Sequence, residues 1–381
     1  MKNPKLIETD AEFEELLERL RHAERFAIDT EFSRENTYFP SLGLVQIAVD
    51  RDVTLVDPLG IDLRALGEIF RGDTEAILHA GTQDLEIFER EIGALPRRIF
   101  DTQLAAAFLG DGIASLGKLV QKYLSVQLDK GSQLADWSRR PLPPRALQYA
   151  ASDVAYLEDL REILVERLSE RGRLEWALEA SEGVLRKGFD LAPAEEAWWK
   201  LKGRSRLRPR AAKIAQTLAA SREARARALN IPPKRVLSDL ALLAMAESPP
   251  EGIDDLAHIR GLDGGRRRGS GAEEILDWVR RGRALPDDAL VLPKDRPEEA
   301  LPSALIALCQ SWAAQRASDE SIDHSLLATR SDIVAFLSTP RRGKLTEGFR
   351  YELLGRDLEA IQEGRAAIAF EGEKLKLIPV G

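Results

Sequence analysis

The chain has 381 residues, of which 44% are apolar and 31% are charged. This length is too great for one hydrophobic core and suffices for two or three domains. A single cysteine, Cys309, excludes a disulfide framework and a cysteine-based zinc site, and no apolar run is long enough to cross a membrane. The N-terminal segment lacks the apolar core of a signal peptide, so we expect a soluble, cytoplasmic protein without a membrane partner.

The first 190 residues alternate between strand and helix patterns. Helical spacing is found over 84–92, over 103–109 and from residue 116 onward, and prolines precede an expected helix of roughly 25 residues that begins at Arg145. Short apolar runs predict strands at 25–28, 42–49, 53–56, 76–78 and 99–100. Three strands that can pair as a meander, followed by alternating units, predict a mixed α/β sheet with flanking helices.

Beyond about residue 192 the strand patterns almost disappear, and two helical segments resemble each other. Val236–Leu240 (VLSDL) parallels Thr329–Ile333 (TRSDI), and the Ser-Asp pair of each copy is expected to cap a helix. A linker at 285–302, which contains four prolines, separates the copies. The sequence therefore predicts two small all-α domains, at 191–290 and 291–381.

The net charge of −8 is unevenly distributed. Residues 1–190 have a net charge of −11, residues 191–290 of +5 and residues 291–381 of −2. The segment 200–213 (KLKGRSRLRPRAAK) holds seven basic residues and no acids, and Trp198-Trp199 precede it. Such a segment can bind phosphates and stack unpaired bases, and Arg266–Arg268 adds a second basic cluster. The alternative is a solvated linker with tryptophans packed between domains.

Asp29 and Glu31 end the first apolar strand, in the sequence FAIDTEF. Residues two apart on a strand point to the same side, so both carboxylates face one site. Their repulsion and burial cost free energy that a divalent cation would offset. The alternative is a polar strand end where both acids contact water, and the pair alone does not decide.

Two further segments carry candidate residues. Tyr149 and Asp153 lie four residues apart in a helical pattern and therefore share one helix face. Asp84 stands where a helix is expected to begin, just after the strand at 76–78. Each has an ordinary explanation as well, namely a Tyr–Asp hydrogen bond on an exposed helix and an acid that interacts with a helix dipole.

In combination these segments are far more specific. FAIDTEF, HAGTQDLEIF and the late YxxxD resemble the three exonuclease motifs of the DEDD superfamily, and the chain is similar to the ribonuclease D family over nearly its whole length. The two helical copies resemble the helicase-and-RNase-D C-terminal (HRDC) domains. The resemblance is carried by IDTEFSRENTYFPSLGLVQIA (28–48), LHAGTQDLEIF (78–88), FDTQLAAAFLG (100–110) and the segment 128–160.

This resemblance implies an RNase H-like exonuclease domain of the α/β class at 1–190, followed by two all-α HRDC-like domains. Tyr149 would position the attacking water, as in the tyrosine subtype, because Gln148 stands where the histidine subtype has its histidine. The four acidic metal ligands would be Asp29, Glu31, Asp84 and Asp153. Two divalent cations, Mg²⁺ or Mn²⁺, about 4 Å apart could bind the attacking water and the leaving 3′ oxygen.

In our preferred arrangement Asp29 bridges both ions. Glu31 and Asp153 complete the shell of the hydrolytic ion, and Asp84 serves the second ion directly or through water. The implied activity is a 3′→5′ exoribonuclease that releases nucleoside 5′-monophosphates from RNA with a 3′ tail, chiefly tRNA precursors, and acts as a monomer.

Two other functions are weighed against this one. A DNA exonuclease of the proofreading type would share the acids, but the HRDC-like copies argue against it. A catalytically silent RNA-binding module would have no reason to keep four mutually repelling acids.

Several nearby residues have a structural explanation or an open one. Asp101 is expected to cap a helix rather than to act in catalysis, and His79 to pack within a strand rather than to bind metal. Candidate RNA contacts precede the catalytic helix, and Gly131 stands where the family commonly has serine, which weakens any contact assigned there. These candidates are Lys130, Trp137, Arg139 and Arg140.

Overall fold

The chain folds as two units, each assembled from separate stretches of sequence. In a computed structural model, residues 4–129, 135–186, 188–189, 191–266, 268–293 and 301–380 are described. Unit 1 comprises Met1–Phe32, Leu42–Phe189 and Pro297–Gly381, and unit 2 comprises Ser33–Ser41 and Asp190–Arg296. Among these described residues no helix is long and apolar enough to cross a membrane.

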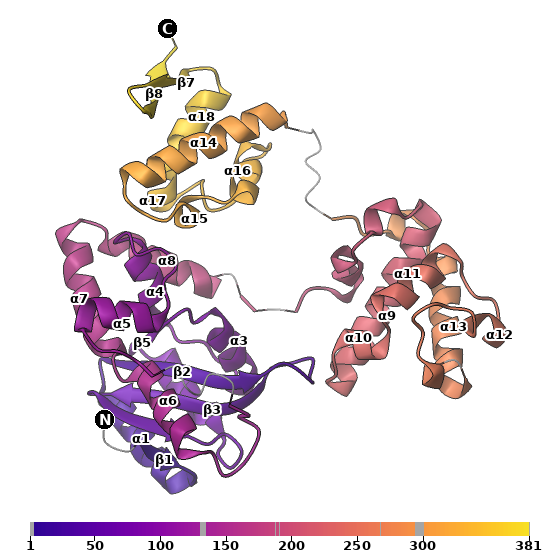
Figure 1. The fold of residues 1–381 in the computed structure, drawn as a ribbon, viewed down its shortest axis with the longest axis horizontal. Coiled ribbons are helices and arrows are strands. Elements are labelled where there is room, and N and C mark those ends of the chain that lie inside the picture. The colour runs from indigo at the N-terminus through magenta and orange to yellow at the C-terminus, as the bar shows by residue number, and fades with distance from the viewer. Residues whose placement is uncertain are drawn as a thin grey trace. The chain divides into compact units, whose positions relative to one another are not determined.

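A six-stranded mixed sheet forms the centre of unit 1 (Figure 1). The strand order is β1-β4-β3-β2-β5-β6; β1 and β4 pair in parallel, β3 and β4 antiparallel, and β2, β5 and β6 run in parallel. Five of the strands were predicted from the sequence, and the short edge strand β1 was not. The strands are β1 (Lys5–Ile7), β2 (Arg25–Ser33), β3 (Ser41–Val49), β4 (Asp52–Val56), β5 (Glu75–Leu78) and β6 (Arg98–Asp101).

Helices cover both faces of this sheet. Phe26 and Ile28 of β2 belong to a core with α1, α2 and α3, whereas Ala27 belongs to a core with α4, α7 and α8. The prediction of a single helix from Arg145 is wrong, because the helix is interrupted at Ala155–Tyr156, which separates α6 from α7. The helices of this part are α1 (Asp10–His22), α2 (Leu66–Arg71), α3 (Thr82–Glu91), α4 (Thr102–Ala107), α5 (Leu116–Leu124), α6 (Pro144–Val154), α7 (Leu157–Glu170) and α8 (Leu174–Arg186).

The C-terminal part of unit 1 is mainly helical but ends in a hairpin. Strands β7 and β8 pair antiparallel, so the expectation of an all-α segment is wrong at its end. The N-cap of α16 is Thr329, which accepts from the backbone of Asp332, and not the predicted Ser331. The elements are α14 (Ser303–Asp319), α15 (His324–Leu327), α16 (Arg330–Leu337), α17 (Gly348–Arg350), α18 (Arg356–Gln362), β7 (Ala366–Glu371) and β8 (Lys374–Pro379).

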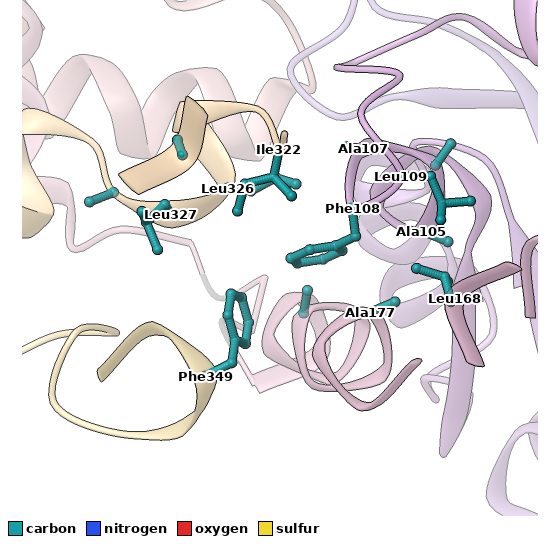
Figure 2. Close-up of a cluster of buried hydrophobic side chains, with 14 of the residues drawn as sticks. Ala105, Ala107, Phe108, Leu109, Leu168, Ala177, Ile322, Leu326, Leu327 and Phe349 are labelled. Carbon is teal, nitrogen blue, oxygen red and sulfur yellow. The ribbon is translucent and has the colours of Figure 1, made fainter. Parts of the chain in front are cut away.

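These C-terminal helices share a hydrophobic core with α4, α7 and α8 (Figure 2). The ring of Phe349 lies edge-on to Phe108, with 5.2 Å between centroids, and stacks on Trp176 at 5.5 Å. Polar contacts frame the apolar ones, since Glu179 accepts from the backbone of Phe349 at 3.2 Å. The burial of several large side chains on both sides makes the two segments one structural body.

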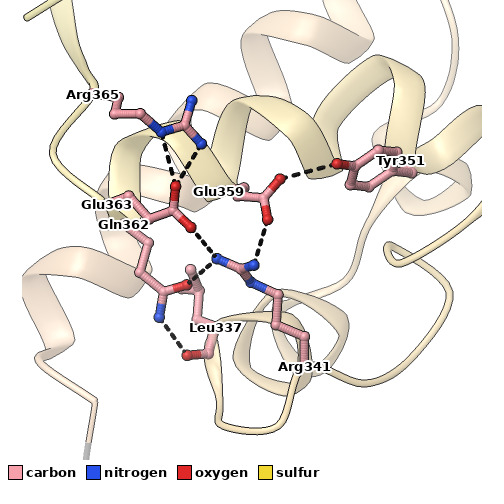
Figure 3. A network of polar contacts seen from close by, with 7 residues as sticks. All are labelled: Leu337, Arg341, Tyr351, Glu359, Gln362, Glu363 and Arg365. Atoms are coloured by element: carbon pink, nitrogen blue, oxygen red, sulfur yellow. Dashed lines mark hydrogen bonds and ion pairs between the residues drawn. The ribbon is translucent and has the colours of Figure 1, made fainter.

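A network of hydrogen bonds and ion pairs joins α18 to the loop after α16 in this C-terminal part (Figure 3). Arg341 donates to Glu359 and, at 3.3 Å, to Glu363. The Tyr351 hydroxyl donates to the other oxygen of Glu359 at 2.9 Å, and Arg365 pairs with Glu363. Each carboxylate therefore binds two donors, which holds α18 against the loop after α16.

Unit 2 contains a separate helical core. The predicted N-cap Ser238 is confirmed, because its hydroxyl accepts from the backbone of Ala241 at 3.1 Å. Its first three helices, α9, α10 and α11, are long, four residues long and of medium length, in the same order as α14, α15 and α16. The helices are α9 (Pro209–Leu229), α10 (Pro233–Val236), α11 (Asp239–Glu247), α12 (Ile253–Leu256) and α13 (Gly269–Ala284).

The segment Ser33–Ser41, which joins β2 to β3, belongs to unit 2. The Tyr38 hydroxyl donates to Glu223 and accepts from Arg227 at 2.9 Å. The backbone of Phe39 donates to the Asn230 side chain at 3.0 Å. The chain therefore leaves β2 directly into contacts with the C-terminal end of α9.

Candidate active site

Strand β2 carries the first two acids of the site. Phe26, Ala27 and Ile28 are fully buried, which fixes the strand in the middle of the sheet between β3 and β5. Asp29 and Glu31 follow on the same face as Ala27, and both are half-buried. The alternation predicted from the sequence thus holds, and the two carboxylates lie on the side of the sheet that α4 and α7 cover.

Thr30 connects β2 to the third acid. Its side chain points to the opposite face from its neighbours, and it is 6% exposed. Both its backbone N–H, at 3.1 Å, and its hydroxyl, at 2.5 Å, donate to Oδ1 of Asp84 in the first turn of α3. Asp84, also 6% exposed, is therefore fastened to the strand that carries Asp29 and Glu31.

Helix α6 supplies the remaining two candidates. Its small residues Ala146, Ala150 and Ala151 are buried against Leu44 and Leu55 of the sheet, which lets the helix approach closely. Tyr149 and Asp153, four residues apart, are half-buried and joined by a hydrogen bond between their side chains. The Tyr–Asp bond considered from the sequence exists, on a half-buried rather than an exposed helix face.

The four acids influence one another electrostatically. Burial raises the pKa of Asp29 well above its ordinary range, and the three neighbouring carboxylates raise it further. Burial and repulsion from Asp153 and Asp84 raise the pKa of Glu31 to about 8. The pKa values of Asp29 and Glu31 are therefore raised by neighbouring carboxylates as well as by burial.

The other two acids have partners that work against burial. Burial raises the pKa of Asp84 to about 6, although the hydrogen bonds from Thr30 lower it. Burial likewise raises the pKa of Asp153 to about 7, against the hydrogen bond from Tyr149. Within the described ranges, the side chains as they lie form no group of three or more His, Cys, Asp or Glu ligands around a single point.

Asp101 and His79 have the structural roles expected of them. Asp101 is the N-cap of α4 and accepts from the backbone of Gln103 and Leu104. The Nδ1 atom of His79 contacts the Thr102 hydroxyl at 3.0 Å, and burial lowers the pKa of the histidine. His79 is therefore a packed residue at a strand end.

Two of the candidate RNA contacts hold α6 in place instead. Trp137 is 4% exposed and lies against Gly43 of β3, where a Cβ would come within 2.5 Å of the Trp137 Cβ. Arg140 pairs with Asp57 and donates to the Gly43 carbonyl at 2.7 Å. Both are corrections, since neither side chain is free to contact RNA. Arg139 is exposed, and Lys130 lies outside the described residues.

The basic segment of unit 2 is accessible, whereas its tryptophans are not. Trp198 is 4% exposed, and the indole N–H groups of Trp198 and Trp199 both donate to the Val291 carbonyl. The tryptophans pack in the core of unit 2 itself, so they neither stack bases nor lie between domains. Six basic side chains are exposed and make no ion pair with any described residue: Lys200, Lys202, Arg204, Arg206, Arg208 and Arg210.

Sequence reasoning missed Thr30, although it stands between the two acids of the DTE sequence. Its role depends on α3 approaching the opposite face of β2, which no local pattern reveals. An uncharged hydrogen-bonding residue between two acids was the signal available.

In the basic loop of unit 2, Arg268 is exposed and Arg266 half-buried, while Arg267 lies outside the described residues.

Comparisons with known proteins identify the class to which this chain belongs. The family model for 3'-5' exonuclease matches residues 4–169, and the HRDC domain model matches residues 211–279. The two matches define a 3′–5′ exonuclease with an HRDC domain. Ribonuclease D of Gluconacetobacter diazotrophicus is 37% identical over 99% of this chain and 97% of its own length, and ribonuclease D of Jannaschia sp. is 37% identical over 93% and 94%.

A solved structure extends the similarity to the whole fold. The crystal structure of Escherichia coli RNase D, described as an exoribonuclease involved in structured RNA processing, aligns with a TM-score of 0.85 and 30% identity. The alignment covers 95% of this chain and 99% of that one. The chain belongs to the ribonuclease D family and is an exoribonuclease. Members of this family act on RNA and normally use divalent metals.

Proposed function

We propose that this chain is a metal-dependent 3′→5′ exoribonuclease that matures tRNA 3′ ends and releases nucleoside 5′-monophosphates. The observation that carries the proposal is the set of four carboxylates, drawn from β2, α3 and α6: burial raises the pKa of each, and the neighbouring acids raise the pKa of Asp29 and Glu31 further. Four such acids are costly unless positive charge is shared among them. A phosphodiester substrate is itself anionic, so the site needs that charge for chemistry as well.

The donor set fits hard divalent cations. Carboxylate oxygens are the ligands that Mg²⁺ and Mn²⁺ prefer, and no thiolate takes part. We propose that two such ions are held by Asp29, Glu31, Asp84 and Asp153. When bound, divalent cations generate a nucleophilic water and neutralise charge on the leaving oxygen. Like charges without a cation are most stable apart, so ion binding would draw the carboxylates together.

We assign Tyr149 the role of orienting the attacking water. Its hydroxyl donates to Asp153, and its oxygen keeps a lone pair that can accept a hydrogen bond. A water placed beside Asp153 can therefore donate to Tyr149 and present its own lone pair to phosphorus. Asp153 would hold the tyrosine hydroxyl in place for this role as well as bind metal.

RNA binding is assigned to unit 2. The six exposed cations at alternate positions from 200 to 210 have no carboxylate partner among the described residues, so they are available to phosphates. We propose residues 191–290 as a first HRDC-like domain with this basic lead-in and 291–381 as a second. The recurrence of the helix order of α9, α10 and α11 in α14, α15 and α16 supports the second assignment. A monomer suffices for this scheme.

The test is digestion of matched 3′-tailed RNA and DNA, with Mg²⁺ or Mn²⁺ and with EDTA. We expect nucleoside 5′-monophosphates from RNA only in the presence of metal, and far slower release from DNA. Asp29→Asn should lower turnover by several orders of magnitude with RNA affinity nearly unchanged, and the exposed Asp73→Asn is the matched control. Equal hydrolysis of DNA would favour the proofreading type, and absence of hydrolysis a silent binding module.

A further inference from the structure

Asp101 is a buried carboxylate whose oxygens accept hydrogen bonds from backbone groups alone, and its negative charge also helps to raise the pKa of Asp84. It ends β6, pairs in register with Leu78 of β5, and is 4% exposed. No Lys, Arg or His of the described residues lies within ion-pair distance of it. Its oxygens instead accept four backbone N–H bonds: from Ala80, Gln103 and Leu104 to Oδ1, and from Gly81 to Oδ2.

The four bonds serve two different elements. Those from Gln103 and Leu104 cap α4, which a serine or asparagine could do equally well. Those from Ala80 and Gly81 hold the turn between β5 and α3, and the Gly81 bond is made by the oxygen that takes no part in the cap. Capping alone therefore does not explain why both oxygens of a buried aspartate are engaged.

The turn that Asp101 holds needs such support. Ala80 has φ +58°, a left-handed conformation that is unfavourable for a residue with a Cβ. Gly81 follows as the N-cap of α3 and has no side chain with which to cap the helix. The entry to α3 is thus fixed from outside the helix, by Asp101.

Asp84 is the third residue of α3, about one helical turn after the Ala80–Gly81 turn that Asp101 holds. Its carboxylate is fastened by Thr30, and the backbone that carries it begins at the turn held by Asp101. We propose that Asp101 is a positioning residue, which sets the place of Asp84 as a metal ligand through the Ala80–Gly81 turn. This inference rests on the proposed function of Asp84.

The test compares Asp101→Asn with wild type and with Ser181→Ala. Asparagine keeps the oxygen that accepts from Ala80, Gln103 and Leu104 but puts an N–H₂ group opposite the N–H of Gly81, so the turn loses one of its two bonds. The control removes the Ser181 hydroxyl that accepts from the backbone of Asp101 and leaves both carboxylate oxygens engaged. Mn²⁺ binding to the protein alone is measured by calorimetry, together with the Mg²⁺ dependence of kcat and KM.

We expect Asp101→Asn to weaken metal binding about tenfold, as removal of groups that orient metal ligands does. KM for RNA should stay unchanged, and high Mg²⁺ should restore most of kcat. Unchanged metal affinity in a folded Asp101→Asn variant, or an equal loss in Ser181→Ala, would overturn the inference. If Asp101→Asn does not fold, Asp101→Ser takes its place. Serine can still cap α4 but cannot hold the Ala80–Gly81 turn, and the same outcomes support or overturn the inference.

A parallel Asp84→Asn variant separates the two levels of the argument. If Asp84→Asn binds metal and cleaves RNA as wild type does, the proposed role of Asp84 fails, whatever Asp101 does. If Asp84→Asn loses metal affinity and Asp101→Asn does not, only the positioning role of Asp101 fails.

Discussion

The hydroxyl of Thr30 can be removed without changing the shape of the strand, because Thr30→Val keeps a β-branched side chain in β2. The substitution deletes one of two hydrogen bonds to Oδ1 of Asp84 and leaves the backbone bond in place. A hydrogen bond to a charged group contributes about 1.5–3 kcal/mol, which corresponds to roughly one to two pKa units at 1.36 kcal/mol each.

The direction of the effect follows from the pKa of Asp84. Burial raises it to about 6 while Thr30 lowers it, so loss of the hydroxyl should raise it toward or above 7. At pH 7 a cation would then have to displace a proton from a larger fraction of the molecules, and metal affinity should fall roughly 2- to 10-fold. At pH 9 the carboxyl group is ionised in either protein, and the difference should be much smaller.

The assay is the half-saturating Mg²⁺ concentration for hydrolysis, together with calorimetric Mn²⁺ binding, at pH 7 and pH 9. Thr54→Val is the matched control, since Thr54 is a 3% exposed threonine of β4 in the same sheet. An unchanged midpoint at pH 7, or an equal change in Thr54→Val, would refute this account of Asp84.

Three further outcomes are expected. Tyr149→Phe should slow hydrolysis roughly 10²–10⁴-fold without moving the metal midpoint, and a tenfold shift of that midpoint would assign the tyrosine to metal support instead. Because burial raises the pKa values of the site's acids in the folded state, the metal-free protein should lose stability as pH rises from about 5 to 8. Thermal melts with and without Mg²⁺ should accordingly show a larger stabilisation at pH 8 than at pH 6. Replacement of Arg204, Arg206 and Arg208 by alanine should make the slope of log affinity for single-stranded RNA against log salt shallower by about 2, and an unchanged slope would show that the segment is only a linker.

Local periodicity predicted which candidate residues share a face, but their assignment to one site came from the family resemblance. The two-residue spacing of Asp29 and Glu31 and the four-residue spacing of Tyr149 and Asp153 each fix a shared face without tertiary information. The place of Asp84 came from family resemblance, because its approach to β2 depends on how α3 crosses the sheet. The same limit hid the role of Thr30.

The errors have the same physical origin. Trp137 and Arg140 are residue types that often contact RNA, and only their close approach to Gly43 shows that they pack against the sheet instead. Trp198 and Trp199 likewise hydrogen-bond to Val291, about 90 residues further along the chain. The hairpin of β7 and β8 was missed although residues 374–377 (KLKL) alternate between charged and apolar side chains, a pattern typical of a strand.

The sequence also suggested a clean boundary near residue 190, where the acidic half ends. The structure places Phe349 against Phe108 and Trp176, so the last helices belong to the same body as the sheet. Removal of everything after residue 190 would therefore expose an apolar face as well as remove the basic segment. Substitution of single cations is for this reason the sharper test of RNA binding.

The shared core also dictates when the protein can be completed during its synthesis. The core beneath α1, α2 and α3 draws only on residues up to Phe189, so it can close as soon as that part has left the ribosome. The opposite core needs residues between Cys309 and Leu358, which are made after all of unit 2. A nascent chain that stops before residue 300 therefore carries an open apolar face on α4 and α8, which marks an unfinished nuclease for aggregation or proteolysis.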